Sequence, residues 1–233
     1  MKKNAILITI AIVTVLCIIV GTTYHYSNIK KSVQYVFGEN ETEWNDENSY
    51  TNTLESFNKI DIDSKIMEIN IKEGSNYSFQ TSFTKASLEP QVKVENGELF
   101  VKQNSVRKSV SGLNNCTITI TVPKDTDINE ITIESNISEV NIDNLKANNI
   151  EVENNIGEIS IDNVSFNKLK ADSNIGEVKV QLPDSFNDYN IKTESNIGII
   201  NIDGKDFKKS YNQKGSTSKE IKIETNIGEI KIR

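Results

Sequence analysis

The chain of 233 residues has little of the side chains that most enzymes and metal proteins use. His25 is its single histidine, with no acid or second histidine nearby, so we expect no catalytic role for it. Cys17 and Cys116 are too few and too far apart for a disulfide framework or a metal cluster. Cys116 is expected to be a small buried side chain. The sequence therefore predicts no catalytic residues, no cofactor and no metal site.

Arginine is also scarce, with Arg107 and Arg233 as the two examples. The first 38 residues carry four lysines and no carboxylate. The remaining 22 basic and 33 acidic side chains give residues 39–233 a net charge of −11. Nucleic-acid affinity comes largely from lysine and arginine replacing counterions along the phosphates. An acidic domain of this kind is not expected to bind nucleic acid.

One long apolar run is present, from Ala5 to Gly21, without a charge. Extended to Thr23, it reaches the roughly 20 residues that a helix needs to cross a membrane. Residues 1–4 are then a short cytoplasmic start and residues 5–23 a transmembrane anchor. The rival interpretation is a cleavable signal peptide, with Lys2 and Lys3 as its charged start. No clean small-x-small cleavage pattern follows the run, which favours the anchor.

The anchor predicts a single-pass protein of the cell membrane. The amino terminus and its lysines favour the cytoplasmic side, and a long following domain crosses largely regardless of its charge. The C-terminal domain is therefore expected outside the cytoplasm. Residues 24–53 lack a regular pattern and are predicted to be a juxtamembrane tether.

Internal repetition decides the expected fold. Five copies share an apolar-x-apolar segment, a polar corner and a second apolar-x-apolar segment, and a degenerate copy precedes them at 60–71. The five copies are residues 131–142, 150–161, 169–180, 191–202 and 221–232. The corners share Asn136, Asn155, Asn174, Asn196 and Asn226, and four of them share Gly157, Gly176, Gly198 and Gly228.

Alternation with a period of two places one set of side chains inward. In the second copy these are Ile150, Val152, Ile159 and Ile161, with Ile156 as a further inward candidate at the corner. A unit of about 19 residues cannot bury its apolar face alone, but stacked units bury a continuous column. We therefore predict an all-β fold: a parallel β-helix or β-solenoid-like repeat stack. The corner glycines are expected to permit a backbone bend that a Cβ would hinder.

The corner asparagines have two structural interpretations. They can form an inward ladder of amide hydrogen bonds, as in other stacked β-structures. They can also be turn residues that tolerate left-handed backbone geometry, and a mixture is expected. The glutamates that follow the glycines could suggest a calcium column, but the calcium nonapeptide is missing, so a solvated acidic face is the favoured interpretation.

The predicted β domain spans residues 54–233, with regular repeats from about residue 117. Residues 92–101 predict a hairpin that turns at Asn96-Gly97. Residues 105–115 and 205–219 are expected to be polar loops. Residues 222–233 are predicted to be the last strand pair, either an exposed edge open to pairing or an end covered by the 205–219 loop.

The strand that ends in Val122-Pro123, followed by repeated Ile-x-x-x-Ser-Asn-Ile-Gly-Glu units, resembles the bacterial putative-adhesin family, which is grouped with toastrack-like cell-envelope domains. The resemblance covers roughly residues 54–233. It implies a right-handed, β-helix-like domain at the bacterial envelope. It implies adhesion or envelope-stress sensing and supplies no catalytic residue.

The expected function is a membrane-anchored, extracytoplasmic module for adhesion, interaction or envelope-stress sensing. Its partner would be an envelope protein, a lipid or a wall polymer. The alternatives are a self-assembling scaffold with weak self-association and a β-helix enzyme acting on polysaccharides. The enzyme would need converging carboxylates in a groove, whereas the acids here alternate along strands. The aromatics near the repeats are few: Phe186, Tyr189, Phe207 and Tyr211.

Overall fold

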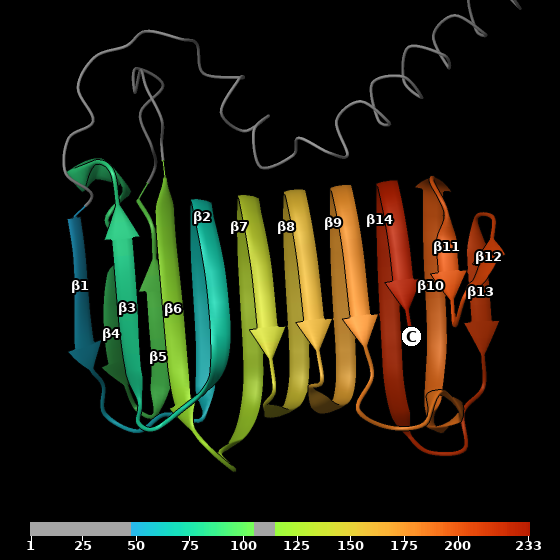
Figure 1. Cartoon of the computed structure of the whole chain (residues 1–233), viewed down its shortest axis with the longest axis horizontal. Coiled ribbons are helices and arrows are strands. Elements are labelled where there is room, and N and C mark those ends of the chain that lie inside the picture. The colour runs from blue at the N-terminus through green and yellow to red at the C-terminus, as the bar shows by residue number, and fades with distance from the viewer. Residues whose placement is uncertain (1–47, 105–114) are drawn as a thin grey trace, which may run out of the picture. The chain divides into compact units, whose positions relative to one another are not determined.

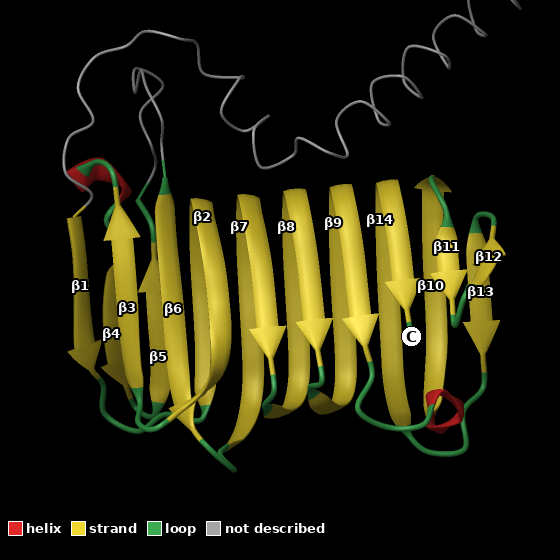
Figure 2. Cartoon of the chain, viewed as in Figure 1, coloured by secondary structure: helices red, strands yellow, loops and turns green. Residues whose placement is uncertain are grey.

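The computed structural model describes residues 48–104 and 115–233, and the chain there is almost entirely β-strand (Figure 2). Its strands in the N-terminal half are β1 (Asn48–Thr53), β2 (Lys59–Gly74), β3 (Ser78–Phe83), β4 (Gln91–Glu95), β5 (Glu98–Lys102) and β6 (Cys116–Pro123). The C-terminal half holds β7 (Asp127–Asp143), β8 (Lys146–Asp162), β9 (Ser165–Gln181), β10 (Tyr189–Ile197), β11 (Ile200–Ile202), β12 (Lys205–Phe207), β13 (Ser210–Gln213) and β14 (Lys219–Ile232). Short 3-10 turns lie at Ala86–Leu88 and Phe186–Asp188.

Each central repeat is one long strand bent at its middle, so that it contributes to two facing layers (Figure 1). Strands β2, β7, β8 and β9 pair in parallel and in register, with Ile131 beside Ile150 and Ile150 beside Leu169. Between the layers, Ile150, Val152, Ile159 and Ile161 are buried as predicted. The predicted parallel stack of coils is therefore confirmed as an open, non-barrel sheet.

Asparagines in left-handed geometry connect the central coils. Asn144, between β7 and β8, has φ of 51°, and Asn163, between β8 and β9, has φ of 54°. Asparagine tolerates this geometry better than most residues. The same two residues stack, since Asn163 Nδ2 donates to Asn144 Oδ1 at 2.6 Å. The turn interpretation of asparagine thus applies to these connections.

The order of the last two coils differs from their order in the sequence. Strand β14 lies between β9 and β10, parallel to both (Figure 1). Its second half also pairs with β11. The prediction that residues 222–233 form the exposed end of the stack is wrong, because both edges of this coil are paired with neighbours.

The segment 205–219, expected to be a loop, carries two short strands that cover this end. Asp203 and Gly204, with φ of 48° and 76°, turn the chain so that β12 runs antiparallel to β11. Strand β13 then pairs antiparallel with β10. These residues therefore form a cap, as the alternative expected, but they cover β10 and β11 and not residues 222–233. Their polar composition concealed this backbone pairing.

The other end of the stack is built on β2, the degenerate copy. Its second half pairs with β6, which is followed by β3 and β1. Its first half pairs with β5, and β4 completes the predicted hairpin through Asn96 (φ 53°) and Gly97 (φ 76°). These positive φ values suit a two-residue hairpin turn.

Strand β1 corrects the expected boundary of the tether at residue 53. Residues 48–53 pair antiparallel with β3, and the ring of Tyr50 packs edge-on against Phe79 and Phe83. The segment has no apolar alternation because one aromatic side chain and backbone hydrogen bonds hold it in place. Residues 48–104 and 115–233 belong to one compact unit, whose continuous core is drawn from residues 57–232.

The predicted anchor at residues 5–23 and most of the predicted loop at 105–115 lie outside the described residues. In the part of the chain that the structure describes, no helix has the length and apolar character needed to cross a membrane.

Candidate functional site

The bend of each coil is the feature that the repeats share most closely, and we call its outward side the arc. In the second repeat the inward residues Asn154 and Ile159 bracket the arc, and the four residues between them turn the chain. Because the coils stack in register, each arc position becomes a row of side chains along the stack.

The first row is an asparagine ladder on the outer surface. Asn174 Nδ2 donates to Asn155 Oδ1 at 2.9 Å, Asn226 Nδ2 donates to Asn174 Oδ1 at 3.0 Å, and Asn196 Nδ2 donates to Asn226 Oδ1 at 3.0 Å. All four side chains are exposed, so the ladder faces solvent and not the core. Asn136 lies at the same position but makes no side-chain hydrogen bond to a described residue.

The glycines of the arc lie one above another where the coils approach most closely. Cβ atoms built on Gly157, Gly176, Gly228 and Gly198 would lie 1.6 to 1.9 Å from a carbonyl oxygen of the neighbouring coil. Their φ values are +131° to +155°. A side chain is excluded here by the neighbouring backbone, as well as by the bend that the sequence suggested.

Between the asparagine and glycine rows runs a row of isoleucines, which we call the isoleucine ridge. In spatial order it consists of Ile66, Ile137, Ile156, Ile175, Ile227 and Ile197. Four of these side chains are clearly exposed: Ile156 at 40%, Ile175 at 42%, Ile227 at 38% and Ile197 at 58%. The expectation that Ile156 points inward is wrong, because the arc turns its whole middle outward. Ile199, 48% exposed, widens the ridge at the capped end.

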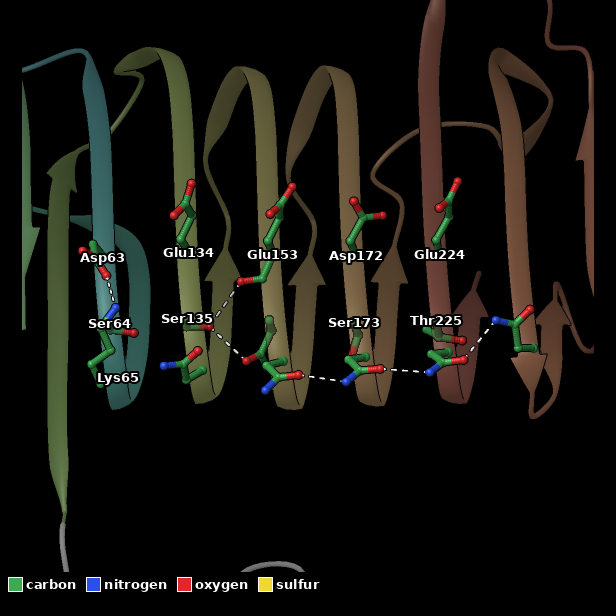
Figure 3. Close-up of a pocket in the computed structure, with 16 residues that line it drawn as sticks. Asp63, Ser64, Lys65, Glu134, Ser135, Glu153, Asp172, Ser173, Glu224 and Thr225 are labelled. Carbon is green, nitrogen blue, oxygen red and sulfur yellow. Dashed lines mark hydrogen bonds and ion pairs between the residues drawn. The ribbon is translucent and has the colours of Figure 1, made fainter. Parts of the chain in front are cut away.

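Two acidic rows run parallel to the ridge on its two sides, the first beyond the asparagine ladder and the second beyond the glycine row. The first holds one carboxylate per coil: Asp63, Glu134, Glu153, Asp172, Glu224 and Glu194. Figure 3 shows Glu134, Glu153, Asp172 and Glu224 side by side along the stack. The second row is Glu68, Glu139, Glu158, Glu177 and Glu229. Like charges directly opposite each other in a sheet are destabilising.

The first acidic row and the asparagine ladder form the walls of a trough of about 540 Å³ along the stack (Figure 3). Its lining includes the ladder and the polar residues between the walls, Ser64, Ser135, Asn154, Ser173 and Thr225. Ser135 Oγ hydrogen-bonds with Asn154 Oδ1 at 3.0 Å, and Asn154 Nδ2 donates to the carbonyl oxygen of Ser138 at 3.0 Å. The trough is therefore lined by side chains that carry carboxylates, amides and hydroxyls, with the ammonium of Lys65 at one end.

Lysines neutralise part of each acidic row. Lys170 contacts Glu151, Glu153 and Asp172 at 2.7 to 3.1 Å, and these hydrogen bonds raise the pKa of its ammonium. Burial opposes ionisation of Glu177, but hydrogen bonds from Lys231 and Lys179 hold its pKa below the ordinary value. The lysines thus favour the charged form of Glu177 despite its burial.

Other candidate groups do not add a reactive centre to this surface. Among residues 48–104 and 115–233, no cluster of histidine, cysteine and acidic side chains has the geometry of a metal site. Cys116 is buried, as expected, and burial raises the pKa of its thiol to about 12. A thiol with that pKa is almost wholly protonated at neutral pH and is a poor nucleophile.

The sequence reasoning overlooked the first acidic row and the exposed ridge. The signal for the acidic row is present in every copy, because an acid stands two residues before the shared asparagine position. The signal for the ridge is weaker: an isoleucine next to a glycine bend can face either side until the bend is known.

These stacked coils match a known family. The profile of the Toastrack DUF4097 family matches residues 57–181, more than half of the chain. The chain belongs to the Toastrack DUF4097 family. The resemblance inferred from the repeated corners is thereby confirmed.

The Toastrack chain is also similar to solved structures. A putative cell adhesion protein from Clostridium sporogenes is 19% identical, with a TM-score of 0.64 over 80% of this chain and 99% of the other. A putative adhesin from Bacteroides fragilis is 16% identical, with a TM-score of 0.40 over 81% of this chain and 97% of the other. At these identities the first likeness shows the fold alone. A search of curated proteins found no match.

Proposed function

We propose that this Toastrack chain is a non-catalytic adhesion or interaction module, anchored in the cell membrane by residues 5–23 with its β domain outside the cytoplasm. The observation that carries the proposal is the arc surface. Its asparagine ladder, isoleucine ridge and acidic rows repeat on successive coils and face solvent. A rigid periodic surface of this kind suits contact with an extended partner.

Two further points support the proposal. Family membership and the adhesin descriptions of structural neighbours agree with a binding role. The acids of the arc lie in rows, mostly paired with lysines, and do not converge on one reacting atom as glycosidase carboxylates do. The alternative of a scaffold that grows from an exposed β14 edge loses its basis, since β14 is paired on both sides.

Topology and contact can be tested on intact cells. Protease added outside should digest a C-terminal tag and spare an N-terminal tag; the opposite result would contradict the proposed orientation. A photo-crosslinking side chain at Asn174, in the arc, should form adducts on intact cells. The matched position Lys93, on the edge strand β4 away from the arc, should form far fewer. Equal crosslinking at both positions would contradict an interaction surface at the arc.

A further inference from the structure

We propose that the isoleucine ridge docks a basic amphipathic helix of a partner, with its apolar stripe on the isoleucines and its basic flanks facing the two acidic rows. The inference rests on the proposed function and names the class of partner for the same surface. It follows from the exposure, spacing and charge of the arc rows.

The ridge is an apolar surface without a partner in the described structure. Ile156, Ile175, Ile227, Ile197 and Ile199 are the exposed large apolar side chains of the described residues. Because the first four stack in register and Ile199 follows Ile197 by two residues on the same arc, they form one strip instead of scattered positions. Together they expose on the order of 300–400 Å², comparable to the largest apolar patch on many monomers, which is often functional.

The area argues against a stable dimer through the ridge. A standard protein–protein interface buries about 800 Å² on each partner, roughly twice what the ridge supplies. Charge argues the same way. Two copies that met ridge to ridge would bring together eleven carboxylates from each copy, six in one row and five in the other, which the lysines beside them offset only in part. Like-charge juxtaposition across an interface is costly.

The same charges select the sign of the partner. Seven lysines pair with the eleven acids of the two rows, which leaves a net charge of −4: Lys65, Lys102, Lys170, Lys192 and Lys222 with the first row, and Lys179 and Lys231 with the second. The net field of the arc is therefore negative, which disfavours anionic polymers and anionic lipid surfaces. A partner with positive groups beside an apolar stripe is complementary to it.

The spacing selects a helix over an extended strand. Neighbouring coils are about 4.8 Å apart, so the six isoleucines span about 24 Å. A helix brings apolar side chains to one face about every 5.4 Å, and about 16 residues cover the ridge. An extended strand lying along the stack repeats its side chains about every 6.7 Å and loses register after two coils. A helix is also about 10–12 Å wide, so long basic side chains on its two flanks extend toward the two acidic rows.

The test uses residues 45–233, which contain the complete core, and three synthetic helical peptides of about 16 residues. The first has a leucine stripe flanked by lysines. The second replaces its lysines with glutamates, and the third keeps its composition but distributes the leucines around the helix. Fluorescence anisotropy should show saturable binding of the first peptide. The other two should bind at least tenfold more weakly, and equal binding of the first two would overturn the proposal.

Variants locate the binding to the ridge. Replacement of Ile156, Ile175 and Ile227 by asparagine should weaken binding of the basic peptide at least tenfold. The thermal midpoint should change little, because the side chains are exposed. Neutralising the acidic row with E153Q, D172N and E224Q should weaken binding at low salt and reduce its salt dependence. The matched control E55Q, D127N and D206N removes three other acids and should preserve binding. Unchanged binding in the isoleucine variant would overturn the proposal.

Other occupants give different outcomes. Ridge-dependent self-association in analytical ultracentrifugation would identify a second copy as the occupant. Ridge-dependent binding to phosphatidylcholine vesicles would identify a lipid surface. Either result, if the basic peptide does not bind, overturns the proposal of a helical partner. If the arc crosslinks a partner on cells while the basic peptide fails to bind, the proposed function stands and the partner class is wrong. If neither crosslinking at the arc on cells nor binding of the basic peptide is detected, the proposed function is contradicted as well.

Discussion

The backbone of Gly176 lies against that of Gly157 in the next coil, and a Cβ built on Gly176 would be 1.7 Å from the carbonyl oxygen of Gly157. The contact is made by backbone on both sides, so no rotamer change can relieve it. The close approach of the two coils therefore requires glycine at this position of the repeat. The same relationship recurs at Gly228 against Gly176 and at Gly198 against Gly228.

Gly176→Ala is therefore expected to lower the free energy of unfolding by about 3 kcal/mol or more, because the coils must separate locally to admit the methyl group. Urea denaturation measures the change. Gly204→Ala is the matched control: its φ is +76°, but nothing lies within 4 Å of the added Cβ. It should cost about 1 kcal/mol, from backbone strain alone. Equal losses in the two variants would contradict the close approach of the coils.

The asparagine ladder should contribute stability according to the number of rungs that each residue joins. Asn174 bonds with both Asn155 and Asn226, whereas Asn196 bonds with Asn226 alone. Asn174→Ala is expected to cost about 1 kcal/mol and Asn196→Ala about half of that. Asn136→Ala, outside the hydrogen-bonded ladder, should be nearly neutral in the same denaturation assay. An effect at Asn136 as large as at Asn174 would contradict the ladder.

Hydrogen exchange tests the position of β14. The amides of Ile223 and Ile230 lie in a strand that is paired on both edges, whereas Tyr211 and Asn212 lie in β13, which pairs with β10 alone. Exchange of the β14 amides should be slower by at least about a hundredfold, because opening them requires a larger part of the stack to unfold. Similar exchange in β14 and β13 would indicate that β14 lies at the end.

Asp143 and Asp162 are neighbouring carboxyl groups at the ends of two adjacent coils. Removing one of the two charges is expected to stabilise the protein in a pH-dependent way. Burial raises the pKa of Asp143, and the neighbouring charge of Asp162 raises it further. The folded state thus disfavours the ionised form of Asp143. Stability is therefore lost as the pH rises from the pKa of this carboxyl in the unfolded chain to its higher pKa in the folded protein. Asp162→Asn should stabilise the protein by up to about 1 kcal/mol at pH 7.

That gain should disappear near pH 3, where Asp143 is protonated in both states and has no charge for Asp162 to repel. Urea unfolding at pH 7 and at pH 3 measures the difference. Asp127→Asn, at an exposed position without a carboxylate partner in its register, is the control and should change stability by less than about half a kcal/mol at either pH. A gain that is equal at both pH values would rule out charge repulsion as its cause.

Local patterns were sufficient for much of the fold. The alternation in residues 150–161 identifies the buried side chains, and Asn96-Gly97 identifies the hairpin, because both depend on interactions within a few residues. Strand β1 and the cap strands β12 and β13 have no such pattern. They are held by backbone pairing to strands distant in the sequence, so composition alone suggested a tether and a loop.

The candidate site was predictable in part. The repeated asparagines mark the arc, but their exposure depends on how sharply each coil bends between Asn154 and Ile159. That bend turns Ile156 outward. The period-two pattern does not predict this, because the pattern holds only within a straight strand. The rows of acids become a surface feature only when the coils stack in register.

By itself, the sequence determined that the chain forms parallel coils, which side chains enter the core, and where glycine must stand. The tertiary structure alone decided the order of the coils. The copies at 191–202 and 221–232 present similar apolar and corner residues to a neighbour, so the repeat pattern alone does not fix which of them pairs with β9. The β12 and β13 pairings hold residues 205–213 against the outer edge of β10 and β11, and β14 then occupies the place between β9 and β10.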